Sequence, residues 1–229
     1  MYEQTFNFSS VFAAYHQLLL GAGLTLWLTV QAIVLGMIVA IIGARAKTSG
    51  PRWVRSSVSA YVEAIRNTPF LLQLYFFFFG LPSIGLRLDP NNAALLTMAV
   101  NLGAYATEIV RAGIEAVPHG QTEAARALGL RPTQIYRFVI LPPALRIIYR
   151  PLAGQFTMVL LGSSIVSAIS ANELTSVANS IQALTFRTFE TYFVVTLMYL
   201  LMVLAFRGMF SVIYAYTFGR SEALQARTR

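Results

Sequence analysis

Long apolar runs separated by clusters of charged residues are the dominant pattern of this chain. A helix needs about 20 mainly apolar residues to cross a bilayer, and five stretches meet that requirement. We place the predicted transmembrane helices at residues 18–42, 58–81, 91–111, 151–171 and 191–216. The pattern therefore predicts an all-α membrane protein with five transmembrane helices, in one domain that spans residues 1–229.

Two pairs of opposite charges fall on the predicted helices. Glu63 and Arg66 lie near the start of the second helix, and Glu108 and Arg111 lie near the end of the third. Residues three apart lie on one face of a helix, so each pair can form an ion pair. We interpret both as structural ion pairs. A proton relay through Glu108 is the alternative, because an acidic side chain inside a membrane is expensive and often functional.

A short amphipathic segment precedes the first predicted transmembrane helix. Its large side chains recur at helical spacing: Phe8, Val11, Phe12, Tyr15 and Leu19. This spacing predicts a short helix on the outer membrane interface. The alternative is a simple extension of the first transmembrane helix.

Composition and charge support a membrane protein. Of the 229 residues, 56% are hydrophobic and 11% are charged, whereas a soluble domain has about 25% charged residues. The formal net charge is +8, and a basic protein can bind nucleic acid. We exclude nucleic acid here, because the basic residues lie between apolar runs and not along one face of a globule.

The basic residues also predict the orientation, because Lys and Arg gather in cytoplasmic loops. They are concentrated after the first and third predicted helices and in the C-terminal tail, while the opposite loops contain only Arg87 and Arg187. The N-terminus is therefore predicted outside and the C-terminus in the cytoplasm. The basic residues on the predicted cytoplasmic side are Arg45, Lys47, Arg52, Arg55, Arg111, Arg126, Arg131, Arg137, Arg146, Arg150, Arg220, Arg227 and Arg229.

The predicted cytoplasmic loop over residues 113–150 is too long to be a plain connector. Glu123–Gly129 is predicted to form a short helix that ends at Gly129. Pro132 fits the first turn of a second helix, with Leu130 or Arg131 at its cap. Pro142 and Pro143 are predicted to break the chain before the fourth transmembrane helix.

This loop resembles the EAA loop of ABC importer permeases. "EAARALGL…VILP" has the spacing of that motif at Glu123, Ala124, Ala125, Gly129, Val139, Leu141 and Pro142. Two further segments, "YVEAIRNTPFLLQLYFFFFGLP" and "GAYATEIVRAGIEAVPHGQTEAARALGL", are similar to permeases of the polar amino acid uptake subfamily, which includes opine permeases. The resemblance runs from about Leu18 to Phe218.

The resemblance implies a type I ABC importer permease in the bacterial inner membrane. Its cytoplasmic helix would be a coupling helix that docks on a separate ATPase. The coupling residues would be Glu123, Ala124, Ala125, Ala127, Leu128 and Gly129. The implied partners are a second permease subunit, two ABC ATPase subunits and a periplasmic or lipid-anchored solute-binding protein. The implied substrate is a small polar amino acid or a related compound.

We expect no catalytic residue, cofactor or metal site in this chain. It has no G-x-x-x-x-G-K-[ST] loop for phosphates, and the nearest match, Gly43–Ser49, has Ala46 in place of the second glycine. ATP and Mg are therefore expected on the partner ATPase. The two histidines, His16 and His119, have no second ligand at metal-site spacing.

Polar residues inside the predicted helices indicate a substrate pathway. One face of the fourth helix carries Gln155, Met158, Gly162 and Ser163, at i, i+3, i+7 and i+8. Asn67 and Thr68 beside Pro69 indicate an irregularity in the second helix, which either marks the pathway or is a simple kink. For Ser163, close helix packing is an equal alternative.

Gly162 departs from the family pattern, because similar permeases often have Asp at that position. Without this carboxylate the chain offers less to the ammonium group of a ligand. Either a non-identical permease supplies the charge, or the ligand is less cationic. We favour a heterodimer over a homodimer. A membrane scaffold that only recruits a cytosolic partner is the alternative function, but it would have no reason to keep polar faces inside its helices.

Overall fold

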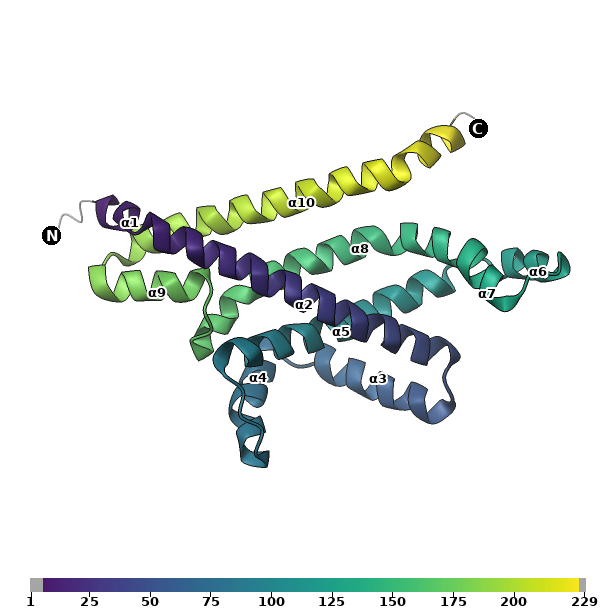
Figure 1. Cartoon of the computed structure of the whole chain (residues 1–229), viewed down its shortest axis with the longest axis horizontal. Coiled ribbons are helices and arrows are strands. Elements are labelled where there is room, and N and C mark those ends of the chain that lie inside the picture. Colours follow the sequence, from purple (N-terminus) through teal and green to yellow (C-terminus); the bar gives the residue numbers. More distant parts are fainter. Residues whose placement is uncertain (1–5, 227–229) are drawn as a thin grey trace. The chain divides into compact units, whose positions relative to one another are not determined.

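A computed structural model of the chain describes residues 6–226, with side chains described for residues 6–219. All regular elements in this part of the chain are helical (Figure 1). The tail arginines Arg227 and Arg229 lie outside the described residues. Contacts divide the chain into a first unit of Met1–Val34, Thr68–Ala99 and Thr157–Phe206, and a second of Leu35–Asn67, Val100–Phe156 and Arg207–Arg229.

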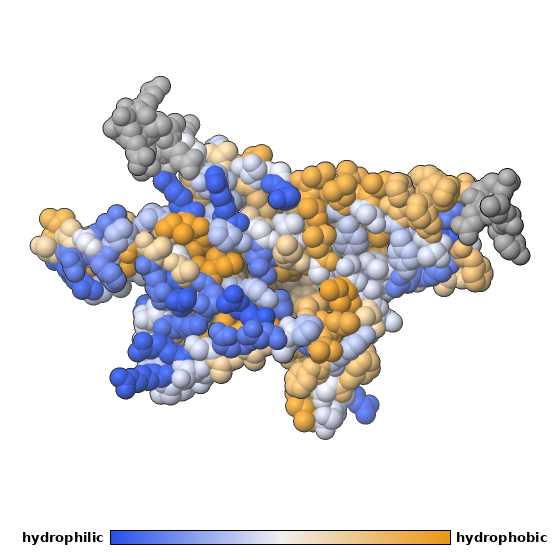
Figure 2. Space-filling view, turned by 180° about the vertical axis from the view of Figure 1, so that it is seen from behind, coloured by the Kyte–Doolittle hydropathy of each residue, from blue (hydrophilic) through white to orange (hydrophobic). Residues whose placement is uncertain are grey.

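Four helical segments among the described residues are long and apolar enough to cross a membrane. They are α2 (Tyr15–Ser49), α5 (Pro90–Glu115), the segment Pro132–Ile169, and Thr188–Gly219 of α10 (Thr188–Ala226). Phe70–Ile84 is a shorter apolar helical segment. Figure 2 shows hydrophobic side chains exposed over broad parts of one face, as expected where lipid replaces water. The prediction of an all-helical membrane protein is confirmed.

The second predicted transmembrane helix is interrupted. The structure has α3 (Arg52–Arg66), then α4 (Phe70–Tyr75), a π-helical turn (Phe76–Gly80) and a 3₁₀ turn (Leu81–Ile84). The predicted span over 58–81 is therefore not one continuous helix. Pro69 explains the break, because proline has no N–H to donate and disfavours a helical conformation at the preceding residue. The irregularity expected beside Pro69 is present.

The proline pair that was predicted to end a helix does not do so. After α7 (Pro132–Gln134) the chain forms a π-helix (Ile135–Ile140), and α8 (Leu141–Gly162) continues through Pro142 and Pro143. The prediction of a break there is wrong. A π-helix widens the turn ahead of the prolines and changes its hydrogen bonding to i→i+5. That arrangement accommodates residues without an N–H.

The first unit has a core in which the N-terminal segment takes part. Val11 of α1 (Ser9–Ala13) is fully buried, and it packs with residues of α2, α9 (Leu174–Thr185) and α10. The expected short N-terminal helix is present, ending before Tyr15. The core residues are Val11, Leu18, Leu174, Ala178, Ile181, Val195 and Tyr199.

In the second unit, α2 and α5 approach closely through small residues. A Cβ atom built on Gly43 would lie 2.5 Å from Thr107 Oγ1, and one on Gly36 would lie 2.8 Å from Leu102 Cδ2. Small residues let helix backbones approach in this way in membranes. Gly43, the first residue of the incomplete phosphate-loop pattern, is thus a packing position.

Candidate functional site

The tip of the 113–150 loop is a helix with a closed C-terminal turn. This helix, α6 (His119–Ala127), begins after Pro118 and ends in Gly129, whose φ of 77° is left-handed. The Gly129 N–H donates to the Arg126 carbonyl (2.9 Å), and the Leu130 N–H donates to the Ala125 carbonyl (3.1 Å). These two bonds form a Schellman motif. Gly129 therefore ends the helix as predicted, but the helix starts four residues before Glu123.

The next turn is also closed by local hydrogen bonds. Arg131 is the N-cap of α7 and Pro132 is its first residue. The Arg131 N–H donates to Gln134 Oε1 (2.8 Å), as in a capping box. The helix–turn–helix therefore has a defined shape on both sides of its turn.

The exposed side of α6 carries small apolar residues together with polar and charged ones. Among the predicted coupling residues Ala125 is buried, whereas Glu123, Ala124, Ala127 and Gly129 are exposed. The exposed fraction of Leu128 is 80%. An open depression beside them is lined by Gln121, Ala124, Ala125, Leu128, Leu130, Phe138, Val139 and Pro143.

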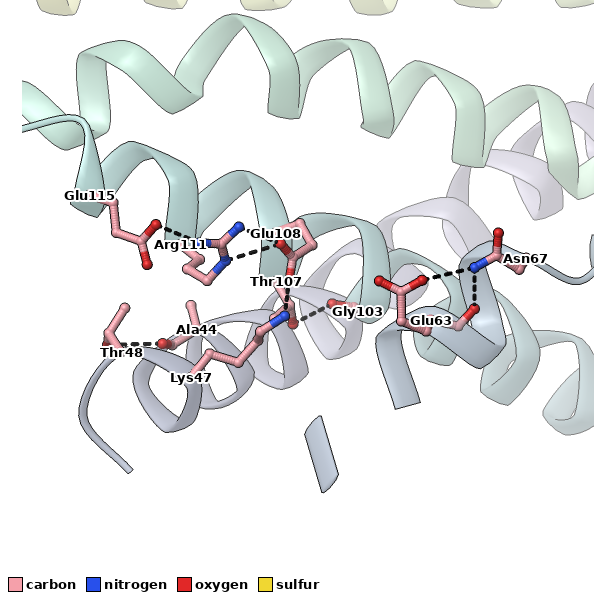
Figure 3. A network of polar contacts seen from close by, with 10 residues as sticks. All are labelled: Ala44, Lys47, Thr48, Glu63, Asn67, Gly103, Thr107, Glu108, Arg111 and Glu115. Carbon is pink, nitrogen blue, oxygen red and sulfur yellow. Dashed lines mark hydrogen bonds and ion pairs between the residues drawn. The ribbon is translucent and has the colours of Figure 1, made fainter. Parts of the chain in front are cut away.

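A network of ion pairs joins the C-terminal ends of α2 and α5 (Figure 3). Glu108 accepts from Arg111 (Oε2 to Nη2, 2.8 Å) and from Lys47 (Oε1 to Nζ, 2.5 Å), and Arg111 also pairs with Glu115. The expected Glu108–Arg111 contact is present. Sequence reasoning missed Lys47 and Glu115. The Arg111–Glu115 pair could have been predicted from its i, i+4 spacing. No local spacing relates Lys47 to Glu108, which lies on another helix.

Glu63 and Arg66 have other partners than each other. Their expected ion pair is not among those formed by the described residues. The Glu63 carboxylate accepts from Asn67 Nδ2 (3.0 Å), while the Arg66 guanidinium lies 5.4 Å from the ring centroid of Tyr105. The helix ends at Arg66, so the capping residue Asn67 competes for the carboxylate.

The predicted pathway residues of α8 differ in exposure. Gln155 is half-buried, and the exposed fraction of Met158 is 64%. Gly162 is the last residue of α8. Ser163 is fully buried at the start of a 3₁₀ helix (Ser163–Ile169), and its hydroxyl donates to the Leu160 carbonyl (2.7 Å).

The two predicted pathway residues beside Pro69 are both bound locally. Asn67 Nδ2 also donates to the Glu63 carbonyl (2.8 Å). Thr68 accepts from the buried Gln73, whose Nε2 lies 2.9 Å from the Thr68 hydroxyl. Asn67 is thus bonded to the end of α3, and Thr68 to a residue of α4.

Comparison with known proteins identifies the family. Residues 32–216 match the family model described as binding-protein-dependent transport system inner membrane component. The chain belongs to this family. It is therefore a multi-pass inner membrane protein and the permease subunit of an ABC importer, with ATP hydrolysis on a separate ATPase, as predicted. The scaffold alternative does not stand.

Three relatives place the permease near amino acid transporters. It is 36% identical to the glutamine transport system permease protein GlnP of Escherichia coli (strain K12), over 87% of this chain and 92% of that protein. It is 40% identical to the L-cystine transport system permease protein TcyB of Bacillus subtilis (strain 168), over 69% and 68%. A crystal structure of an amino acid ABC transporter with histidines has a chain with a TM-score of 0.86 at 36% identity, covering 92% of the permease and 98% of that chain. The predicted resemblance to permeases of the polar amino acid uptake subfamily is confirmed.

In the first unit of the permease, Glu173 is a fully buried acid with three hydrogen bonds. Its carboxylate caps α9, accepting from the N–H groups of Thr175 (2.7 Å) and Ser176 (2.6 Å), and it also accepts from the Tyr199 hydroxyl (2.7 Å). Burial raises the pKa of this carboxyl group above its ordinary value, although the hydrogen bonds oppose the shift.

Glu108→Gln is expected to lower the stability of the permease without changing the pH dependence of uptake. The substitution removes the charge shared by Lys47 and Arg111, whose side chains are 15% and 30% exposed. Leaving them without this partner should cost about 1–3 kcal/mol. Thermal unfolding of the purified permease measures the loss. Glu115→Gln, at a 52% exposed position, is the control and should cost less. A shifted pH profile of uptake in the Glu108 variant would instead support the proton relay.

Proposed function

We propose that this permease forms one half of the translocation pathway of an importer for polar amino acids or related compounds such as opines. The observation that carries the coupling part of the proposal is the exposed group of Ala124, Ala127 and Leu128 at the C-terminal end of α6, followed by two closed turns. The named relatives act on glutamine and cystine, and one solved structure contains histidines. These compounds share the amino acid group, which supports the substrate class.

We propose that α6 transmits motion from the ATPase to the membrane helices. Exposed Ala124 and Ala127 permit close approach of a partner backbone, and Leu128 offers it an apolar side chain. The Schellman motif and the capping box hold the shape of the tip. ATP binding can drive the permease only if the ATPase has different affinities for two states of the permease. A rigid tip, in chain continuity with α5 and α8, favours such transmission.

The proposed topology has five membrane crossings. Phe70–Ile84 has 15 residues, or about 22 Å at 1.5 Å per residue, which is less than the roughly 30 Å of a hydrocarbon core. The second crossing would therefore include part of α3 as well. The N-terminus would lie outside and the C-terminus in the cytoplasm, because Lys and Arg gather on the inner side.

The proposed assembly contains two permease subunits, two ATPases and a solute-binding protein. The family description names dependence on a binding protein. We favour a non-identical second permease, because Gly162 provides no charge where similar permeases often have Asp. The ammonium group of a basic or neutral amino acid would then contact a carboxylate of the partner permease.

Gln155 is the residue of α8 that we expect to contact the substrate. It is half-buried on a continuous helix, and its amide can donate and accept. Met158 and Gly162 follow at i+3 and i+7 on the same helical face. Ser163 is a weaker candidate, because its hydroxyl is bonded to the helix backbone. Asn67 and Thr68 would shape the pathway at the break before α4.

ATP-dependent uptake in proteoliposomes tests this function. The permease, its ATPase, its partner permease and its binding protein should take up a polar amino acid only with ATP, and omission of the ATPase should abolish uptake. Gln155→Ala should raise the apparent KM about three- to tenfold, as expected for a lost hydrogen bond of about 1 kcal/mol. Gly154→Ala is the control, since its Cβ would meet no atom within 4 Å. Full uptake without the ATPase would refute the function, and an unchanged KM would remove Gln155 from the pathway.

A further inference from the structure

The α2–α3 hairpin carries three exposed arginines with no acidic counterpart. Arg45 lies near the end of α2, and Arg52 and Arg55 lie in the first turn of α3. All three are exposed, and no ion pair among the described residues includes them. The sequence contains no Asp or Glu between Glu3 and Glu63. The positive charge of this hairpin is therefore not neutralised locally.

Lys47, on the same hairpin, does not belong with these three exposed arginines. Its side chain is 15% exposed, and its ammonium group pairs with Glu108 (Figure 3). Within the part of the chain that the structure describes, the hydrogen-bond partner of the Arg45 side chain is the Ser49 hydroxyl, at 3.3 Å. Of the four basic side chains at residues 45–55, Lys47 forms an ion pair with α5, whereas the three arginines are exposed. Figure 2 shows hydrophilic residues at the end of this hairpin.

The depth of the patch follows from the sequence and the hairpin geometry. The apolar run of α2 continues through Ile42, and Arg45 follows within one helical turn. Arg45 and Arg55 are each five residues from Gly50, where the chain reverses, so both lie about 7 Å from the turn at 1.5 Å per residue. The arginines are therefore expected at the level of the lipid headgroups.

An exposed tryptophan adjoins these charges. Trp53 follows Arg52, and its exposed fraction is 73%. Tryptophan is enriched at membrane–water interfaces, where the ring contacts the hydrocarbon boundary and the N–H contacts headgroups. An anionic headgroup layer is attracted to basic residues beside a transmembrane helix. Exposed arginines together with an exposed tryptophan at this depth match an anionic lipid surface better than a soluble protein.

We propose that Arg45, Arg52, Arg55 and Trp53 form a binding surface for anionic phospholipid headgroups, which we call the hairpin patch. Guanidinium groups match phosphate oxygens in geometry and charge. The proposal is independent of the transport function and of the amino acid transported. It implies that the permease selects anionic lipids from a mixed bilayer at this end of α2 and α3.

Tryptophan fluorescence offers a direct test, because the chain has only Trp27 and Trp53. The full-length Trp27→Phe permease, with Trp53 as its reporter, is placed in vesicles of phosphatidylcholine and phosphatidylglycerol. One lipid at a time is brominated close to its headgroup. Brominated phosphatidylglycerol should quench Trp53 more than brominated phosphatidylcholine at equal content. The preference should shrink at high salt, because salt screens exposed charges.

Neutralising the patch should remove the preference. Each of Arg52→Gln and Arg55→Gln should reduce it by up to about fivefold, as expected for one arginine at an anionic surface. Arg126→Gln in the exposed face of α6 removes a charge elsewhere and should leave it unchanged. Equal quenching by both lipids would overturn the proposal. The proposal would also be overturned if neither brominated lipid quenched Trp53 fluorescence and if only binding of the ATPase changed the exposure of Trp53. That result would show that Trp53 contacts a protein.

Discussion

Replacing Gly129 with valine is expected to reduce ATP-driven uptake at least about tenfold while leaving the permease in the membrane. Gly129 has a φ of 77°, and a Cβ atom there would meet nothing within 4 Å. The cost is therefore one of backbone conformation alone, about 1–2 kcal/mol for a side chain in the left-handed region, or roughly tenfold in an equilibrium. Valine should open the Schellman turn and reorient the tip of α6. Uptake and ATP hydrolysis, measured in the same proteoliposomes, should become uncoupled.

Two control variants separate the turn from the helix. Gly120→Ala lies in the same helix, where an added Cβ also meets no atom within 4 Å, and it should leave uptake unchanged. Gly129→Asn should fall between wild type and valine, because asparagine tolerates the left-handed conformation. Normal uptake by the valine variant would contradict the coupling role. Loss of that variant from the membrane would show that the turn serves folding.

Glu173→Ala is expected to destabilise the permease by about 2–4 kcal/mol. The change removes the N-cap of α9, worth about 1 kcal/mol, and leaves the Tyr199 hydroxyl without its carboxylate partner, at a cost of about 1–3 kcal/mol. It also leaves a space at a fully buried position. Denaturation of the purified permease measures the loss. Asp89→Ala is the control, because Asp89 also accepts backbone N–H bonds at a helix start, but in an exposed position.

The raised pKa of Glu173 gives this prediction a pH dependence. Because the folded pKa lies above the unfolded one, the folded state binds more protons between the two values. This contribution to stability is fully present below the unfolded pKa and is lost as pH rises through the folded pKa. Glu173→Gln cannot ionise, so it should flatten that part of the stability profile. A Gln variant with the wild-type slope would show that another group titrates there.

The sequence was sufficient wherever a local rule decided the structure. The apolar run over 18–42 has to lie in a helix, since a bilayer leaves backbone groups no other partners. Gly129 had to end α6, because glycine adopts a left-handed conformation at little cost. The spacing from Glu123 to Pro142 was enough to recognise the permease family.

Three prolines, at two places in the chain, show where a local rule has more than one outcome. Pro69 interrupts the second predicted helix, whereas Pro142 and Pro143 remain inside a helical segment. Proline removes a hydrogen bond in both places. Around Pro142 and Pro143, a π-helical segment absorbs the loss. The identity of the residue does not specify which response the chain makes.

By itself the sequence determined the membrane class, the approximate positions of four long helices, the end of α6 at Gly129 and the family. Each of these depends on residues close together in the chain, through hydrophobic length, turn chemistry or motif spacing. Only the tertiary structure decided that Lys47 pairs with Glu108, that Glu63 binds Asn67 and that Glu173 is buried against Tyr199. A charged side chain takes the partner that packing brings near it, and Glu108, which binds Lys47, and Tyr199, which binds Glu173, lie on helices that are distant in sequence.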